Sequence, residues 1–209
     1  NTDRALSCKK DGFITLRHNQ IRNITAKLLK EISHDVCIEP TLQPLTGEVL
    51  GKTSNESEEA RLDISARGFW ITSQKAFFDV RVFNPNAGRY VNQKISKCYE
   101  INEKEKKKHY NERILQVEHG SFTPLVMSAT GGMGQESRKF FARLCEMLAE
   151  KRKQRLSYVS SWVRRKICFA LMNSVCICIR GSRTVFSCKL EESVSPEVDA
   201  VVSECTSTV

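Results

Sequence analysis

The sequence predicts an α/β fold in which a mixed central sheet is flanked by helices, with a C-terminal helical extension. Two observations predict this fold. Stretches with apolar residues at three- and four-residue steps alternate with short runs of strand-forming residues, so helices separate the β runs. The 209 residues also suffice for a domain with a substantial core, and the apolar run at 167–179 is shorter than the roughly 20 residues of a membrane span.

The first helix is predicted over residues 16–33, where isoleucine and leucine recur at helical spacing. A short β run at 35–40 follows and is closed by Pro40, which has no N–H for a strand ladder. Residues 42–59 are rich in turn-forming and acidic residues, which predicts either a hairpin or a mobile loop. The glycines of GEVLGKT (47–53) are separated by three residues rather than the four of a phosphate-binding loop, so no nucleotide site is predicted.

The remaining elements alternate in the same way. They are β runs at 61–65 and 75–83 joined by a tight turn through Gly68, a charged helix at 91–116, a β run within 114–129, and helices at 137–154 and 158–179. The predicted segments are a remnant of an upstream segment at 1–15, the α/β domain at 16–156, the helical extension at 157–189, and a Ser- and Glu-rich disordered tail at 190–209.

An aspartate stands within each of the β runs RLDIS (61–65) and KAFFDVRVF (75–83). Because successive side chains of a strand face opposite sides, Asp79 and Arg81 share one face, and the apolar residues beside them share the other. We therefore expect Asp79 and Arg81 to lie near Asp63. A buried carboxylate without a partner costs several kcal/mol of lost hydration, so the two aspartates need a cation.

Two cations fit this arrangement. Arg81 would give a buried ion pair with Asp63 and Asp79 that only fixes the sheet. A divalent metal ion is the alternative, because neighbouring carboxylates repel unless one takes up a proton or a hard cation such as Mg²⁺ lies between them. Oxygen ligands completed by a phosphate are the arrangement expected for metal-assisted phosphodiester cleavage.

The order of elements and the two aspartates resemble the PD-(D/E)xK, or restriction-endonuclease-like, nuclease superfamily. Its core runs helix, three strands, helix and strand, with Asp on the second strand and Asp/Glu-x-Lys on the third. The matching residues are Asp63 in RLDIS and Asp79-Val80-Arg81 in FFDVRV, within a resemblance that covers about residues 16–148. It implies a restriction-endonuclease-like αβββαβ core.

The resemblance also implies a metal-dependent DNA endonuclease that uses Mg²⁺ or Mn²⁺. Asp63, Asp79 and the carbonyl of Val80 would bind the metal ion. Glu31 stands in LLKEIS, at the first-helix position where the family often keeps an acidic residue, and would hold a metal-bound water or a second ion. Arg81 would stabilise the charge that grows on the phosphate.

One departure from the family pattern concerns its lysine, which is replaced by Arg81. Arginine keeps the positive charge and can grip a phosphate by two hydrogen bonds, but it does not readily give up a proton to act as a base. Lys94 and Lys107 on the following helix are candidates for the missing lysine, although a solvated, charged helix face explains both more simply.

Longer stretches resemble a set of uncharacterised animal proteins associated with reverse-transcriptase-bearing retroelements. These stretches are RHNQIRNITAKLL, IEPTLQPLTGE, FFDVRVFNPNA and VEHGSFTPLVMSATGGMG. The resemblance implies a place within a larger retroelement polyprotein. The opening DRALSC is similar to the end of a zinc-knuckle-like segment in such proteins, but Arg4 replaces its histidine and only Cys8 remains, so no zinc site is predicted.

The formal charge of +9, from 33 basic and 24 acidic residues, favours a polyanionic partner. The densest basic segment, KRKQRLSYVSSWVRRK (151–166), interleaves basic and aromatic residues, which suits phosphate contacts without sequence preference. A solvated helix face and a nuclear-import signal are the alternatives. The predicted nucleic-acid-binding residues are Lys94, Lys107, Arg152, Lys153, Arg155, Arg164, Arg165 and Lys166.

Three functions are compatible with these observations: a metal-dependent DNA endonuclease or its degenerate descendant, a non-catalytic nucleic-acid-binding module, and a structural remnant. No signal peptide precedes the domain, and most of the nine cysteines stand in apolar or helical contexts, so we expect an intracellular, nuclear protein. We expect DNA as the partner, no membrane and no small-molecule cofactor. His18 is expected to be a cap-region or surface residue.

Overall fold

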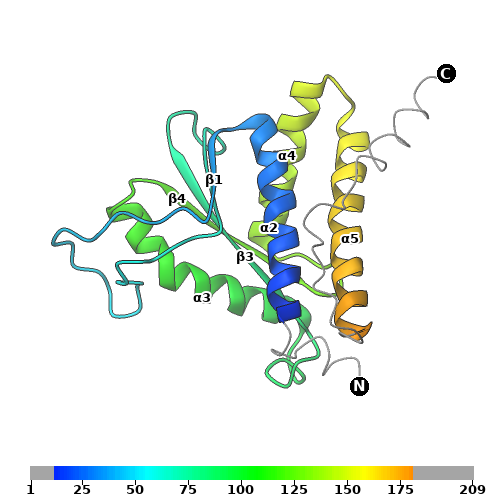
Figure 1. Cartoon of the computed structure of the whole chain (residues 1–209), viewed down its shortest axis with the longest axis horizontal. Coiled ribbons are helices and arrows are strands. Elements are labelled where there is room, and N and C mark those ends of the chain that lie inside the picture. Colours follow the sequence, from blue (N-terminus) through cyan, green and yellow to red (C-terminus); the bar gives the residue numbers. More distant parts are fainter. Residues whose placement is uncertain (1–11, 181–209) are drawn as a thin grey trace.

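The computed structural model describes residues 12–180, and these contain a four-stranded mixed sheet flanked by four helices (Figure 1). The predicted α/β class and the order of elements are confirmed. Predictions for residues 1–11 and 181–209, including most of the upstream remnant and the whole tail, lie outside the described residues. The elements are α2 (Phe13–Ile32), β1 (His34–Ile38), β2 (Ile64–Arg67), β3 (Lys75–Phe83), α3 (Ile95–Gln116), β4 (Ser121–Ser128), α4 (Gln135–Arg152) and α5 (Leu156–Arg180).

The strands lie in the order β1-β2-β3-β4. β1 and β2 are antiparallel, as are β2 and β3, whereas β3 and β4 run parallel over eight residue pairs from Ala76–Ser121 to Phe83–Ser128. The turn between β2 and β3 passes through Gly68 at a φ of 84°, a conformation that side chains with a Cβ rarely adopt. The parallel connection needs a long crossover, and α3 supplies it.

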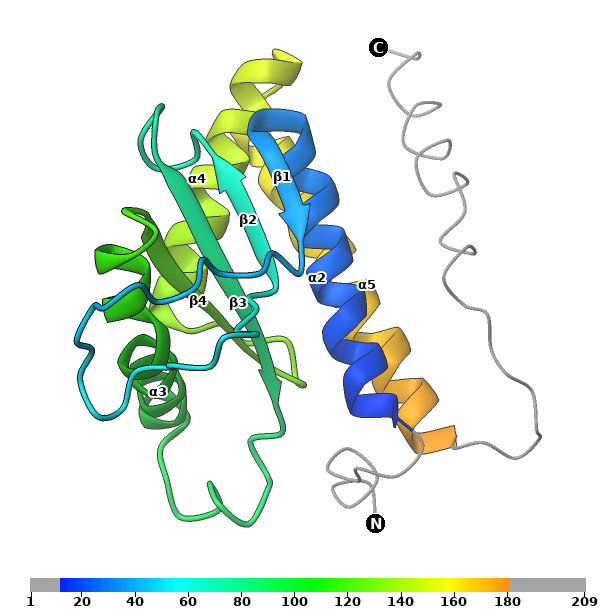
Figure 2. The ribbon, with the colours of Figure 1, turned by 60° about the vertical axis from the view of Figure 1, so that its left-hand side comes forward.

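Helices α2, α4 and α5 cover one face of the sheet, and α3 covers the other (Figure 2). Phe78 and Val80 of β3 are buried in the main core cluster together with residues of α2, α4 and α5. Phe77, from the opposite face of the same strand, packs in a second cluster with Ile114 of α3 and Phe122 of β4. The alternation of side chains along β3 therefore follows the sequence prediction, with Phe77, Asp79 and Arg81 on the side of α3.

Helix α5 was predicted as part of an extension, but it belongs to the main core. Val159, Val163, Ile167 and Leu171 recur at helical spacing and are buried in the same cluster as α2 and α4. The boundary predicted between residues 156 and 157 falls at the first turn of α5. Within the described residues, the predicted domain and its extension therefore share one hydrophobic core.

The long connection between β1 and β2 is irregular beyond its base, and α3 holds it in place. The base is closed by a bridge between Thr41 and Arg61. Arg113 is fully buried and donates from its guanidinium to the backbone carbonyls of Gln43, Asn55 and Ser57 at 2.8 Å each. These bonds fix the connection against the face of the molecule that α3 covers.

The beginnings of two strands, β2 and β4, differ most from the prediction. β2 begins at Ile64 rather than at residue 61, so Asp63 lies at a bend immediately before the strand. The β run predicted within 114–129 begins only at Ser121, as β4. Ile114 belongs instead to the buried face of α3, and the chain turns at Gly120 before the strand. A Cβ at Gly120 would stand 2.6 Å from the carbonyl of Lys75, so the close approach of β4 to β3 requires glycine there.

Within residues 12–180, none of the helices has the length and apolar character needed to cross a membrane.

Candidate functional site

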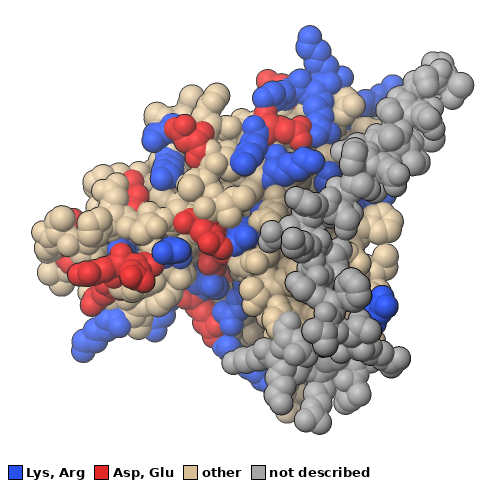
Figure 3. All heavy atoms as spheres, in the orientation of Figure 1, with Lys and Arg blue, Asp and Glu red and all other residues tan. Residues whose placement is uncertain are grey.

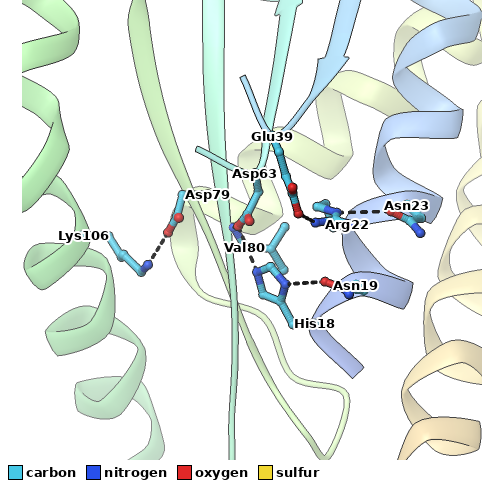
Figure 4. A network of polar contacts seen from close by, with 9 residues as sticks. All are labelled: His18, Asn19, Arg22, Asn23, Glu39, Asp63, Asp79, Val80 and Lys106. Carbon is cyan, nitrogen blue, oxygen red and sulfur yellow. Dashed lines mark hydrogen bonds and ion pairs between the residues drawn. The ribbon is translucent and has the colours of Figure 1, made fainter. Parts of the chain in front are cut away.

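Asp63 lies where β2 separates from β3. The pairing of the two strands ends at Ile64 and Phe78, so the backbone of Val80 has no β2 partner. The side chain of Asp63 takes that place, since its Oδ2 accepts a hydrogen bond from the Val80 N–H at 2.6 Å (Figure 4). In a strand the N–H and C=O of one residue point to the same side, so the Val80 carbonyl also faces the side of Asp63.

His18 approaches Asp63 from α2. Its Nε2 lies 3.0 Å from Asp63 Oδ2, and its Nδ1 lies 3.3 Å from Oδ1 of Asn19 (Figure 4). Burial alone would lower the pKa of His18, but the hydrogen bond and the charge of Asp63 outweigh it, so the pKa is raised. The expectation that His18 is a cap or surface residue is wrong, because α2 directs it towards the sheet.

Asp79 faces α3 and meets Lys106. The Asp79 side chain is only 8% exposed, and its Oδ2 lies 2.6 Å from Nζ of Lys106. Burial raises the pKa of Asp79, and the charge of Asp63 adds to this effect. Lys106 opposes the rise without cancelling it. The charge of Asp63 is therefore close enough to raise the pKa of Asp79, while each aspartate has its own partner, Lys106 for Asp79 and His18 for Asp63.

Arg81 lies on the same face of β3 but contacts a different carboxylate. Its Nη1 donates to Oε2 of Glu105 at 2.9 Å, and the other oxygen of Glu105 accepts from Arg89. The alternative in which Arg81 forms the ion pair with Asp63 and Asp79 is therefore not observed, and each of the three side chains has a different partner. Arg81 is 28% exposed and Arg89 50%, so both guanidinium groups reach the surface near Asp79.

Glu31 lies away from the two aspartates. It stands thirteen residues after His18 on α2, which corresponds to about 20 Å along the helix axis. Its carboxylate accepts bonds from Nε and Nη2 of Arg152 at 2.7 to 3.0 Å. The structure thus does not bring Glu31 to the site predicted for it. Glu31 lies near the C-terminal end of α2, whereas His18, which contacts Asp63, lies near the N-terminal end.

The lysine that reaches the aspartates is Lys106, a residue that the sequence reasoning missed. Lys94 immediately precedes α3, and Lys107 pairs with Glu136 at 3.3 Å. Lys106 lies four residues after the fully buried Asn102 and four before the half-buried Tyr110. It therefore belongs to the inward stripe of α3, a stripe hidden in the sequence by the run of charged residues around it.

Six of the eight basic residues predicted to bind nucleic acid, those between positions 152 and 166, lie near the junction of α4 and α5 (Figure 3), whereas Lys94 and Lys107 belong to the region of α3. Trp162 lies between two of them, with the guanidinium of Arg152 4.3 Å and Nζ of Lys166 4.8 Å from its ring centre. Arg152 also pairs with Glu31, so part of its charge is compensated. The exposed members of the group near α4 and α5 are Lys153, Arg155, Arg164 and Arg165.

The donor set at the two aspartates fits a hard divalent cation. Mg²⁺ is usually held by one or two carboxylates, with water and substrate oxygens completing its shell. Asp63, Asp79 and the Val80 carbonyl are oxygen donors of this kind. Among residues 12–180, no group of three or more His, Cys, Asp or Glu side chains is arranged to hold a metal ion.

No protein-family model matches the chain, and no curated protein shows significant similarity to it.

Proposed function

We propose that this domain is a metal-dependent DNA endonuclease of the PD-(D/E)xK type, in which α3 rather than β3 supplies the lysine. The observation that carries the proposal is the convergence of Asp63, Asp79 and Lys106 on the β3 backbone at Asp79 and Val80. The order helix, three strands, helix and strand supports it, since the resemblance implies the same order. DNA as the partner, a nuclear location and a place in a retroelement polyprotein belong to the same proposal.

In this proposal Asp63, Asp79 and the carbonyl of Val80 hold Mg²⁺ or Mn²⁺. A bound ion would act as a Lewis acid on a phosphate oxygen and lower the pKa of a coordinated water molecule. Lys106 keeps an ammonium group beside Asp79, where it would meet the negative charge of a phosphate next to that carboxylate. Lysine also releases a proton more readily than arginine, which is the property that Arg81 lacks.

The neighbouring residues would orient the carboxylates and the substrate. His18 and the Val80 N–H both contact Oδ2 of Asp63, so this side chain is held in one position. Arg81 and Arg89 stand on either side of Glu105 and would contact phosphates of the DNA strand flanking the cleaved bond.

Nicking of supercoiled plasmid DNA with Mg²⁺ or Mn²⁺ tests the proposal. Asp79→Asn and Lys106→Ala are each expected to lower the nicking rate about 100-fold or more, because the first removes a charged ligand of the metal ion and the second removes the cation beside the phosphate. Lys104→Ala is the matched control, since Lys104 lies on the same helix, is 72% exposed and pairs with Glu100. Equal nicking by the parent and the Asp79→Asn protein would exclude this site as the source of the activity.

A non-catalytic nucleic-acid-binding module is the second candidate, and one observation favours it. Lys106 and His18 already compensate Asp79 and Asp63, so the folded chain needs no metal ion to satisfy these carboxylates. In this case DNA binding would weaken steeply with salt, would not depend on a divalent cation, and would be unchanged in the Asp79→Asn protein. The same plasmid assay, run beside a binding assay, distinguishes the two candidates.

A further inference from the structure

Glu105 occupies an anion site that two arginines form. Its Oε2 accepts a bond from Nη1 of Arg81 at 2.9 Å, and its Oε1 accepts one from Nη2 of Arg89. The arginines come from different parts of the chain, since Arg81 belongs to β3 and Arg89 to the connection that leads from β3 to α3. Two guanidinium groups therefore share one carboxylate, and the three side chains together keep a net positive charge.

The connection that carries Arg89 is anchored, so this arginine is held at the site. Tyr90 is buried with Phe83 in a core cluster, and its hydroxyl donates to Oδ1 of the buried Asn102 of α3 at 2.9 Å. The guanidinium of Arg89 lies 5.5 Å from the centre of the Tyr90 ring, within the range of a cation–π contact. Arg81 stands on the inner strand β3. Both arginines are therefore positioned in advance of any ligand.

Glu105 is the member of the cluster that can leave. Its side chain is 40% exposed, so a change of rotamer is enough to carry the carboxylate from the arginines into water. Rotations of this kind take picoseconds to nanoseconds at exposed positions. Lys106, the next residue, is paired separately with Asp79. The contact of Glu105 with the arginines is therefore exchangeable, whereas the lysine remains at the site.

The carboxylate of Glu105 has the chemistry of a DNA phosphodiester. Each group carries one negative charge and offers two acceptor oxygens to guanidinium groups. A terminal phosphate carries nearly two charges and three acceptor oxygens, so it matches the carboxylate less closely. The arginines also begin two residues from Asp79, on the same face of β3. The ligand that this site fits is thus an internal phosphate of a strand that passes Asp79.

We propose that Glu105 is an internal competitor for DNA, which holds the place of an internal phosphate and is displaced by it when DNA binds beside Asp79. The inference rests on the proposed function and adds the regulation of its phosphate site. Only the fraction of molecules in which Glu105 has left can bind the phosphate, and the apparent affinity for DNA is reduced by that fraction. Glu105 therefore weakens binding without touching the DNA.

Equilibrium binding of a duplex oligonucleotide, measured without divalent cations, tests the displacement. We expect Glu105→Gln to bind about tenfold more tightly than the parent, since a neutral amide holds guanidinium groups less strongly than a carboxylate does. Glu100→Gln is the matched control, because Glu100 lies on the same helix, is 46% exposed, and joins the two cations Lys97 and Lys104. It removes the same charge and should raise the affinity by about twofold or less.

A double-variant cycle shows whether the gain acts through the arginines. Arg89→Gln should weaken binding little in the parent, where Glu105 occupies the guanidinium group. The same change should weaken binding about tenfold in the Glu105→Gln protein, where the phosphate occupies it. An Arg89→Gln effect of equal size in both backgrounds would overturn the proposal, as would equal affinities of the Glu105→Gln and Glu100→Gln proteins.

The binding measurement and the nicking assay separate this inference from the proposed function. Nicking by the parent, together with equal binding by the Glu105→Gln and Glu100→Gln proteins, would support the nuclease and contradict the displacement. Tighter binding by the Glu105→Gln protein, with no nicking by any of the proteins, would support the displacement and contradict the nuclease.

Discussion

Asp79 lies in a nearly closed environment, and Lys106 is the cation that compensates it. A carboxylate at 8% exposure loses most of its hydration, and the ion pair with Lys106 offsets part of that cost. Hydrogen bonds likewise offset the lost hydration of Asp63, whose Oδ2 contacts His18 Nε2 and accepts from the Val80 N–H. Each aspartate is thus stabilised by a helix from a different face of the sheet.

Replacing Lys106 should therefore destabilise the fold. We expect Lys106→Met to lower the free energy of unfolding by about 3 kcal/mol, because it leaves a buried carboxylate without its cation. Urea unfolding measures the change, with Lys104→Met as the surface control. The double variant Lys106→Met/Asp79→Asn should regain most of the loss, and a double variant no more stable than Lys106→Met alone would contradict the pairing.

The pair of His18 and Asp63 should make stability depend on pH. The folded-state pKa of His18 is raised above the ordinary 6.5, so the folded protein binds the imidazole proton more tightly than the unfolded chain does. The contribution of the pair is therefore fully present below about pH 6.5 and is lost as the pH rises through the raised pKa. Unfolding of the parent and of His18→Gln should differ most near pH 6 and least near pH 9. A difference that grows with pH would contradict this assignment.

The sequence predicted some of these residues and missed others for physical reasons. Strand alternation placed Asp79 and Arg81 together on one face of β3, and the structure confirms this, because both side chains pair with residues of α3. The sequence did not predict the roles of Lys106 and His18. The direction of a side chain on a helix depends on which face packs against the sheet, and charged residues near both positions obscure that face. Glu31 was assigned by its place in the family pattern, but helix rise carries it away from the aspartates.

At the scale of elements, α3 organises both the site and the loop between β1 and β2. Lys106 reaches Asp79 from its middle, while Arg113 and Glu112, near its C-terminal end, bind the loop. The loop returns the chain to Asp63, whose backbone carbonyl accepts a bond from the N–H of Glu39 at 2.9 Å. The position of Asp63 thus depends on contacts that α3 makes far from it.

Removal of Arg113 should loosen this loop. We expect Arg113→Met to cost about 3 kcal/mol of unfolding free energy, since three backbone carbonyls lose a charged donor. Limited proteolysis should then cut first between residues 43 and 57. Lys108→Met, at an exposed position of the same helix, is the control, and equal cleavage of both proteins would show that Arg113 does not hold the loop.

Sequence periodicity identified the type and order of the elements, most directly for α2, α4 and α5, because each of these helices buries one regular face. It failed at their ends. The beginning of β2 is set by where Asp63 replaces the strand partner of Val80, and the beginning of β4 by the close contact of Gly120 with Lys75. Both are tertiary contacts, which no local pattern encodes.

At the scale of the molecule, charge is distributed unevenly. The exposed basic residues near the junction of α4 and α5 include Lys153, Arg155, Arg164 and Arg165, and α5 has no acidic residue among them. A formal charge of +9 concentrates polyanions around the protein, and this group gives them a place to bind.

Salt dependence should reveal whether this group contacts DNA. The plot of log affinity against log salt has a slope of about 0.9 per phosphate contact on double-stranded DNA. We therefore expect Arg164→Gln/Arg165→Gln to reduce the slope by about 2. Lys52→Gln/Lys108→Gln removes the same charge from exposed positions away from α5 and should leave the slope closer to that of the parent. Equal effects of the two pairs would indicate a response to net charge alone.

The central claim is that Asp63 and Asp79 together bind a divalent cation, and calorimetric titration with Mn²⁺ tests it most directly. The account predicts one Mn²⁺ per parent chain, no binding to Asp79→Asn, and tighter binding to Lys106→Ala, in which no ammonium group competes for the carboxylate. Absence of Mn²⁺ binding to the parent, or equal binding to the parent and Asp79→Asn, would contradict it.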